Sequence, residues 1–154
     1  MDGYKLWYLG SDRHRNGVGI LVDEELREPV GLDREEKKRF WVALDEVVRG
    51  MPSSKKIMVA GDFNGNIGVL PGGYDYMHGG YGFGERNDEG VALLDFTRSF
   101  RMMVVNSSFL KKKDHLITFQ STIAKTQIDF LLLKKGDRVL CQDCKVILSE
   151  NLLT

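Results

Sequence analysis

The stretch Met58–Gly68, MVAGDFNGNIG, joins a short apolar run to a segment of acid, amide and glycine residues. The run from Lys56 to Ala60 is typical of a buried strand. Residues two apart on a strand share one face, so Asp62 and Asn64 are predicted to point the same way, with Phe63 directed into the core. A carboxylate beside an amide suits a hard cation, an attacking water or a phosphate oxygen.

Two other interpretations of this stretch are open. Asn64-Gly65 is a strong hairpin-turn signal, and Asp62 could cap such a turn with its side chain. An EF-hand calcium loop fits only at its first ligand positions. Ile67 stands where that loop requires glycine, and Gly73 stands where it requires a bidentate glutamate.

The bulk properties are those of an ordinary globular chain. Its 154 residues suit one domain over 1–154, with 42% hydrophobic and 29% charged residues. Lys+Arg and Asp+Glu number 22 each, so net charge favours no class of partner. No apolar run approaches the ~18 residues of a membrane span, and no secretory signal pattern is present. Two cysteines are too few for a disulfide framework, so we expect an intracellular protein, nuclear or cytoplasmic.

Hydrophobic patterning predicts two helices. One covers Asp33–Arg49, with an apolar stripe of Phe40, Trp41, Leu44, Val47 and Val48. The other covers Asp88–Phe100, is capped by Asn87, and directs Val91, Leu94 and Phe96 inward.

The predicted strands surround these helices, in the order ββαβ, a glycine-rich loop over Pro71–Gly84, then αβββ. This order favours an α+β fold in which helices pack on mixed sheets. The strands are Lys5–Leu9 and Gly17–Val22 as a hairpin, Lys56–Ala60, Met102–Asn106, Leu116–Gln120 and Gln127–Leu133, with a weak hairpin over Val139–Leu148.

A second acid interrupts an apolar strand. Asp129 lies within QIDFLLL, Gln127–Leu133, where an ionised carboxylate costs several kcal/mol unless it is paired or hydrogen-bonded. It could be a satisfied structural acid. Together with Asp62, and with amide companions beside each acid, it favours an active site.

Four blocks carry a family resemblance. They are GDFN at 61–64, GERN at 84–87, TFQS at 118–121 and QIDF at 127–130. In this order they resemble the endonuclease/exonuclease/phosphatase superfamily, and most closely the endonuclease domains of non-LTR retrotransposons and the related craniofacial development protein 2-like sequences. The resemblance extends from about Gly17 to the C-terminus.

The resemblance implies a DNase I-like four-layer sandwich, two packed mixed β-sheets flanked by helices. It also implies metal-dependent hydrolysis of phosphodiesters in nucleic acid, most of all DNA, with Mg²⁺ or alternatively Mn²⁺. Asp62 would orient or deprotonate water, Asn64 would hold the scissile phosphate, and both would serve as metal ligands. Asp129 would orient a catalytic histidine.

Arg86 and Asn87 are candidate substrate-binding residues, because arginine and helix N-termini both favour anions. The alternative is a capping asparagine beside a surface arginine.

The family pattern is incomplete in this chain. The family's metal-binding glutamate, in a Gln-Glu-Thr-like context, has no counterpart. A segment before the long helix is absent between Glu28 and Asp33, and no histidine follows the last strands. His14, His78 and His115 are expected to be exposed loop residues. We therefore expect a truncated fold with impaired activity. The alternatives are an inactive remnant that binds a partner or has no function, and a phosphatase on a small phosphoester.

Overall fold

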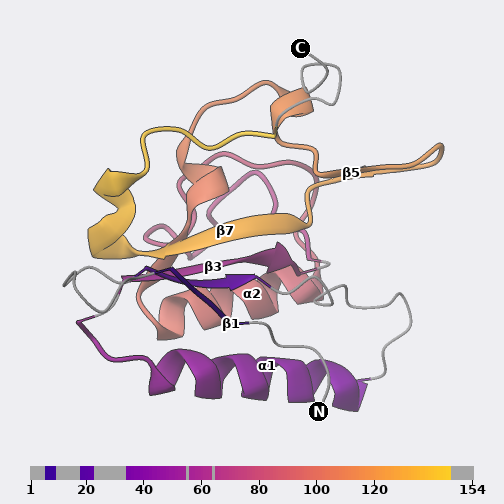
Figure 1. The fold of residues 1–154 in the computed structure, drawn as a ribbon. Helices are drawn as coiled ribbons and strands as arrows, with labels where there is room; N and C mark the ends of the chain where they lie inside the picture. Colours follow the sequence, from indigo (N-terminus) through magenta and orange to yellow (C-terminus); the bar gives the residue numbers. More distant parts are fainter. Residues whose placement is uncertain (1–5, 10–17, 23–33, 55, 64, 147–154) are drawn as a thin grey trace.

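A computed structural model describes residues 6–9, 18–22, 34–54, 56–63 and 65–146. These residues form a mixed five-stranded sheet with both helices on one face (Figure 1). The strand order is β1-β2-β3-β7-β4. The strands are β1 (Leu6–Leu9), β2 (Val18–Val22), β3 (Lys56–Asp62), β4 (Met102–Val104) and β7 (Asp129–Lys134). The prediction of an α+β chain is confirmed.

The sheet is built around β3 and β7. β1 pairs antiparallel with β2, which confirms the predicted pairing of these strands. β2 runs parallel to β3, and the helix between them provides the crossover that a parallel pair requires. β7 lies antiparallel between β3 and β4, so two strands distant in sequence form the centre of the sheet.

Helix α1 (Arg34–Gly50) lies beneath the sheet (Figure 1). Its predicted apolar stripe is confirmed, with Leu44 and Val48 buried and Phe40, Trp41 and Val47 packed against the core. Arg49 at its last turn pairs with Asp45 one turn earlier. The predicted first residue, Asp33, lies outside the described residues.

Helix α2 (Asp88–Ser99) packs on the same face of the sheet. The predicted cap is confirmed, because the Asn87 side chain accepts a hydrogen bond from the Gly90 N–H at 2.8 Å. Leu94 and Phe96 are buried as predicted. Val91 is only half-buried, and Leu93 is fully buried in addition.

The core lies between the sheet and the two helices. β3 contributes Ile57 and Val59, and β7 contributes Phe130 and Leu132, in the alternation expected of strands with one face on the core. The strand residues between these, such as Met58 and Leu131, are only half-buried on the opposite face.

A second large sheet is not formed by the described residues. Besides an isolated bridge between His78 and Val104, the described residues form one more strand pair. It is the two-residue hairpin of β5 (Phe119–Gln120) and β6 (Lys125–Thr126), which projects from the molecule (Figure 1). The strand predicted over Leu116–Gln120 is therefore shorter, because a 3-10 turn at Lys113–His115 uses the Leu116 N–H. Phe119 and Ile123 of the hairpin are exposed, so the hairpin does not bury its large apolar side chains.

Two other strand predictions are corrected. β4 ends at Val104, and Val105–Ser108 forms a 3-10 turn whose Ser107 hydroxyl donates to the Val104 carbonyl. The hairpin predicted over Val139–Leu148 is wrong in its described part. Lys135–Leu140 is a 3-10 helix, and the residues from Cys141 to Val146 are irregular.

Candidate active site at the end of the central strands

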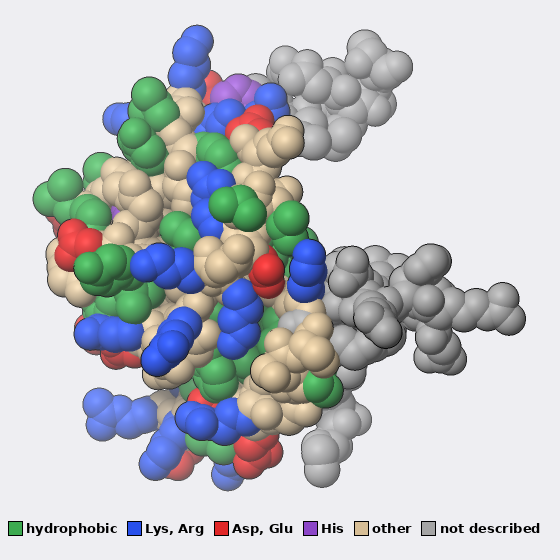
Figure 2. Space-filling view, turned by 90° about the vertical axis from the view of Figure 1, so that its left-hand side faces the viewer, with side chains coloured by type: hydrophobic (Ala, Val, Ile, Leu, Met, Phe, Trp, Pro, Cys, Tyr) green, Lys and Arg blue, Asp and Glu red, His purple; other side chains and the backbone are tan. Residues whose placement is uncertain are grey.

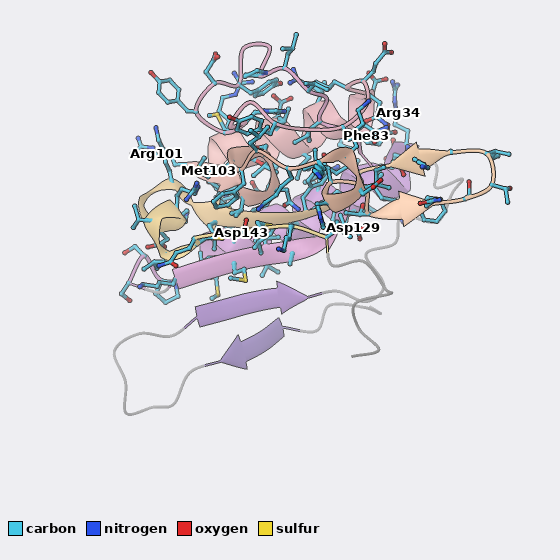
Figure 3. All side chains as sticks on the ribbon, turned by 90° about the horizontal axis from the view of Figure 1, so that it is seen from above. Arg34, Phe83, Arg101, Met103, Asp129 and Asp143 are labelled. Atoms are coloured by element: carbon cyan, nitrogen blue, oxygen red, sulfur yellow. The ribbon has the colours of Figure 1, made fainter. Side chains whose placement is uncertain are left out.

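The sheet brings the two predicted acids to one place. In the β3–β7 register, Asp62 lies directly opposite Asp129. The pairing continues one residue further, because the Phe63 N–H donates to the Ile128 carbonyl at 2.9 Å. Asp129 lies at the end of the sheet from which the β5–β6 hairpin projects (Figure 3). The side chain of Asp62 and the whole of Asn64 lie outside the described residues.

Phe63 anchors this end of the sheet. Its ring is buried and stacks on Trp41 of α1, with the centroids 6.0 Å apart and the planes at 15°. Phe130, in β7 beside Asp129, is buried in the same core. The predicted inward orientation of Phe63 is confirmed, and burial on both strands holds the backbone of the two acids at the sheet end.

Thr118 fixes the start of β7. Its hydroxyl oxygen accepts hydrogen bonds from the backbone N–H groups of Ile128 (2.9 Å) and Asp129 (3.1 Å). The TFQS block therefore lies against the QIDF block. Thr118 also lines a hollow of about 100 Å³ with Asp114, Ile117, Phe119 and Gln120. Sequence reasoning assigned Thr118 no role, although it belongs to one of the four family blocks.

Gln127, the amide companion of Asp129, was not among the site residues that the sequence analysis named. Its side chain is buried, and neither its amide nitrogen nor its oxygen has a hydrogen-bond partner. Its signal in the sequence is an amide two residues before an acid in an otherwise apolar strand.

Asn87 joins helix α2 to the loop that follows β3. Its side-chain oxygen accepts from the Asn66 N–H at 2.9 Å, in addition to capping the helix. Its own N–H donates to the Asn66 carbonyl at 3.1 Å. Gly65 packs directly on the Glu89–Gly90 backbone, where a Cβ would approach to 2.6 Å. The helix N-terminus is therefore held against the loop that leaves the strand end.

Arg86 fastens the loop before α2 in this structure. Its guanidinium donates to four backbone carbonyl oxygens, those of Ile67 (2.9 Å), Leu70 (2.6 Å), Pro71 (2.9 Å) and Gly72 (3.4 Å). It also lies over the Tyr74 ring, 5.2 Å from the centroid. These contacts support a structural role for Arg86, and likewise for Asn87. Substrate binding by the two residues stays a prediction.

His78 is buried, so the expectation that it is exposed is wrong. Its Nε2 is 2.8 Å from the Gly68 carbonyl, and its Nδ1 accepts from the Gly80 N–H at 3.0 Å. Nδ1 must therefore be unprotonated, with the proton on Nε2. Burial, and to a smaller degree the charge of Arg86, lower the pKa of His78. Its ring fastens the glycine-rich loop and has no free nitrogen for catalysis.

His115 is half-buried, with Nδ1 3.0 Å from the Val146 carbonyl, and His14 lies outside the described residues.

The lowered pKa of His78 predicts a loss of stability on acidification. The folded state binds fewer protons than the unfolded state, so the free energy of unfolding falls as pH drops below the unfolded value of ~6.5. Protonation of Nδ1 would also break its bond with Gly80. Urea unfolding at pH 7.5, 6.5 and 5.5 measures this, with His78→Gln as the comparison. We expect a smaller pH dependence in the variant, and equal slopes would contradict the assignment.

The described residues contain no group of three or more His, Cys, Asp or Glu side chains that could hold a metal ion. In the same part of the chain, no helix is both long and apolar enough to cross a membrane.

The chain is similar to craniofacial development protein 2. The protein from Tragulus javanicus is 27% identical, and that from Bos taurus 23% identical, in alignments of 181 positions that cover 94% of this chain. The chain spans about a third of these relatives, 31% and 30% of their lengths. No protein-family model and no solved structure matches it.

The alignments are longer than the 154-residue chain, so they contain gaps in this chain. Residues present in the relatives therefore have no counterpart within the matched region of this chain. The similarity to craniofacial development protein 2 was expected from the four sequence blocks, and it extends over nearly the whole chain.

Proposed function

We propose that this chain is a metal-dependent phosphodiester hydrolase of nucleic acid, of the retrotransposon-derived DNA endonuclease type, with impaired activity. The observation that carries the proposal is the register that sets Asp62 opposite Asp129 at the end of two anchored strands. The similarity to craniofacial development protein 2 supports it, because the superfamily of those sequences hydrolyses phosphodiesters. The nucleus or cytoplasm is then the expected location.

The proposed fold is a truncated DNase I-like sandwich, within one domain. Two features support it: the helices cover one face of the mixed sheet, and the other face carries the half-buried apolar residues Met58, Ala60 and Leu131. In a four-layer sandwich, a second sheet would pack on that other face.

The oxygen donors at the strand end suit a hard divalent cation such as Mg²⁺ or Mn²⁺. Asp62 and Asn64 would hold it, with Asp129 beside them. A bound cation would supply charge neutralisation at phosphate oxygens and acidify water. Asp62 would orient the attacking water and take up its proton. The Asn64 amide would donate to an oxygen of the scissile phosphate.

Impaired activity follows from what the site lacks. Among the described side chains, which do not include that of Asp62, no group of three His, Cys, Asp or Glu could hold the cation, and both His78 nitrogens are already engaged. Residues that act as a unit in catalysis lose most of their effect when one is missing. Because both nitrogens of His78 are engaged elsewhere, a role for Asp129 in orienting a histidine has less support than a role in neutralising the cation.

Nicking of supercoiled plasmid tests this function. We expect slow Mg²⁺-dependent nicking that EDTA abolishes. The nicking rate should fall about 100-fold or more in Asp62→Ala and in Asp129→Asn, the effect expected when a general base or the residue that positions it is lost. Asp75→Ala removes an exposed acid of the glycine-rich loop and is the matched control. Circular dichroism establishes that each variant is folded.

Two outcomes would sink the proposal. Nicking that persists unchanged in both site variants would belong to a contaminant. No nicking by a folded wild-type protein, with either Mg²⁺ or Mn²⁺, would leave a remnant without the chemistry.

A second candidate function, binding of nucleic acid without cleavage, rests on a different surface. At the opposite end of the sheet, cationic side chains stack on aromatic rings: Lys135 on Tyr76 (4.2 Å), Arg138 on Phe109 (4.4 Å), and both Arg49 (5.3 Å) and Lys134 (5.8 Å) on Phe100. Figure 2 views this end and shows Lys and Arg side chains distributed among hydrophobic ones. Arg101, also at this end, is exposed (Figure 3).

A gel-shift assay in EDTA tests this surface. If it binds the phosphate backbone, an Arg101→Glu, Lys135→Glu double variant should lose affinity for duplex DNA and show a shallower salt dependence. Asp62→Ala should bind as the wild type does. Equal affinity of the double variant and wild type would refute this function.

A further inference from the structure

Helix α1 has an outer face that no described element covers. The helix is the outermost layer of the described fold, and its apolar stripe packs toward the sheet (Figure 1). On the outer side, Val42 is 50% exposed. An open hollow of about 290 Å³ surrounds this residue, and its walls are the side chains of Glu35, Lys38, Arg39, Val42, Ala43 and Glu46.

The charges of this face are arranged symmetrically about Val42. In the stretch KRFWVALDE (38–46), Lys38 and Arg39 precede Val42 by four and three residues, and Asp45 and Glu46 follow it by three and four. Two positive charges therefore lie on the N-terminal side of Val42, and two negative charges lie on its C-terminal side. Such a face is complementary to itself when a second copy is turned end for end, which is the relation between two subunits about a two-fold axis.

Arg39 and Glu46 have no ion-pair partner among the residues that the structure describes, and both are exposed. They are seven residues apart, beyond the spacing of three or four at which side chains of one helix pair. Lys38 is also exposed and without such a partner, whereas Asp45 pairs with Arg49 of its own helix. The charges of Arg39 and Glu46 are therefore available to a second molecule.

We propose that the outer face of α1 binds the same face of a second copy of this chain, with the two helices antiparallel about Val42. Arg39 then faces Glu46 of the second copy, Lys38 faces its Asp45, and the two Val42 side chains pack on each other. Positions 39, 42 and 46 recur at helical spacing and form the seam, with positions 38 and 45 beside it.

The same charges exclude the parallel arrangement. Two parallel copies in register would set each residue against its own counterpart, so Arg39 would meet Arg39 and Glu46 would meet Glu46. Like charges placed against each other disfavour an interface, whereas the antiparallel arrangement pairs opposite charges on both sides of Val42. The chain has a formal net charge of +0, so no overall repulsion opposes the approach of two copies.

The interface is small, so we expect a weak dimer. Helix α1 has 17 residues and is about 25 Å long. One helix pair with a single valine from each copy at its centre is small against the ~1,000 Å² that a stable interface buries. Exposed ion pairs are also screened by salt. We therefore expect a dissociation constant in the micromolar to millimolar range that rises with salt concentration.

Sedimentation equilibrium of the whole chain tests the proposal, over micromolar to submillimolar concentrations at low and high salt. The wild type should be a monomer–dimer mixture whose dimer fraction falls at high salt. Arg39→Glu and Glu46→Arg each set like charges against each other at two symmetric contacts, and each should raise the dissociation constant about tenfold or more. The double variant Arg39→Glu, Glu46→Arg exchanges the charges and should dimerise as the wild type does. An equimolar mixture of the two single variants should form a heterodimer.

Arg34→Glu is the matched control, because it makes the same change of charge at an exposed position of the same helix. In the proposed arrangement position 34 lies opposite Gly50, so this variant should dimerise as the wild type does. Circular dichroism establishes that every variant is folded. A wild type that stays monomeric at submillimolar concentration would overturn the proposal. Equal effects of Arg34→Glu and Arg39→Glu, or a double variant that fails to recover the dimer, would overturn it as well.

Discussion

Gly90→Ala is expected to destabilise the protein by about 3 kcal/mol, the upper end of the usual cost of overpacking. A Cβ at Gly90 would overlap the backbone oxygen of Asn66, and backbone atoms cannot rotate away as a flexible side chain can. The Asn66 oxygen is also held, because it accepts from the Asn87 N–H. Helix α2 would have to move off the loop that follows β3, which disturbs the strand end as well.

Urea unfolding of Gly90→Ala and Gly50→Ala measures this effect. Gly50 ends helix α1, and a Cβ there would meet nothing within 4 Å. Because alanine is the better helix former by about 1 kcal/mol, Gly50→Ala should be neutral or stabilising. If the two variants behaved alike, the close approach of helix and loop would not exist in solution.

Phe63→Ala is expected to cost about 3–5 kcal/mol, as for other buried aromatic residues. The Phe63 ring is 3% exposed and stacks on Trp41, so its removal leaves a cavity between β3 and α1. Typical domains are stable by about 5–15 kcal/mol, so this single change could unfold much of the population. The loss would be accompanied by loss of any nicking, because Phe63 holds the backbone between Asp62 and Asn64.

Two matched variants test whether the loss of stability comes from removal of packing in the core or from removal of any phenyl ring. Phe63→Leu keeps most of the volume and should cost less than half as much as Phe63→Ala. Phe119→Ala removes a ring that is 51% exposed on the β5–β6 hairpin, and should change stability by less than about 0.5 kcal/mol. Similar losses in Phe119→Ala and Phe63→Ala would show that the strand end is not anchored in the core.

Sequence patterns predicted the helices well, because the interactions that form a helix join residues three or four positions apart. The apolar stripe of α1 recurs with the helical period, and Asn87 caps α2 through a residue only three positions further along the chain. β3 and β7 were predictable as apolar runs that are too short for helices. The acids that stand in or beside apolar strands supplied Asp62 and Asp129 as candidates, and the four blocks of the resemblance supplied their expected roles.

Predictions failed where a distant partner decides the local structure. The run after Leu116 is apolar enough for a strand, yet only Phe119 and Gln120 find a pairing partner there. The expected hairpin near Cys141 is not formed. Lys135–Leu140 is a 3-10 helix, and the Val146 N–H donates instead to the distant His115 carbonyl at 2.9 Å. His78 looked like a loop residue in sequence, and its burial depends on contacts with Gly68 and Gly80.

The sequence by itself determined the helices, the central strands and the acids at their ends, because periodicity, capping and alternation act between near neighbours. The tertiary structure decided that Asp62 lies opposite Asp129, that Thr118 holds the start of β7, and that Gln127 is buried without a partner. Register and burial depend on which strands pair and what packs on them. Those contacts join residues far apart in the chain, and no local pattern of residues encodes them.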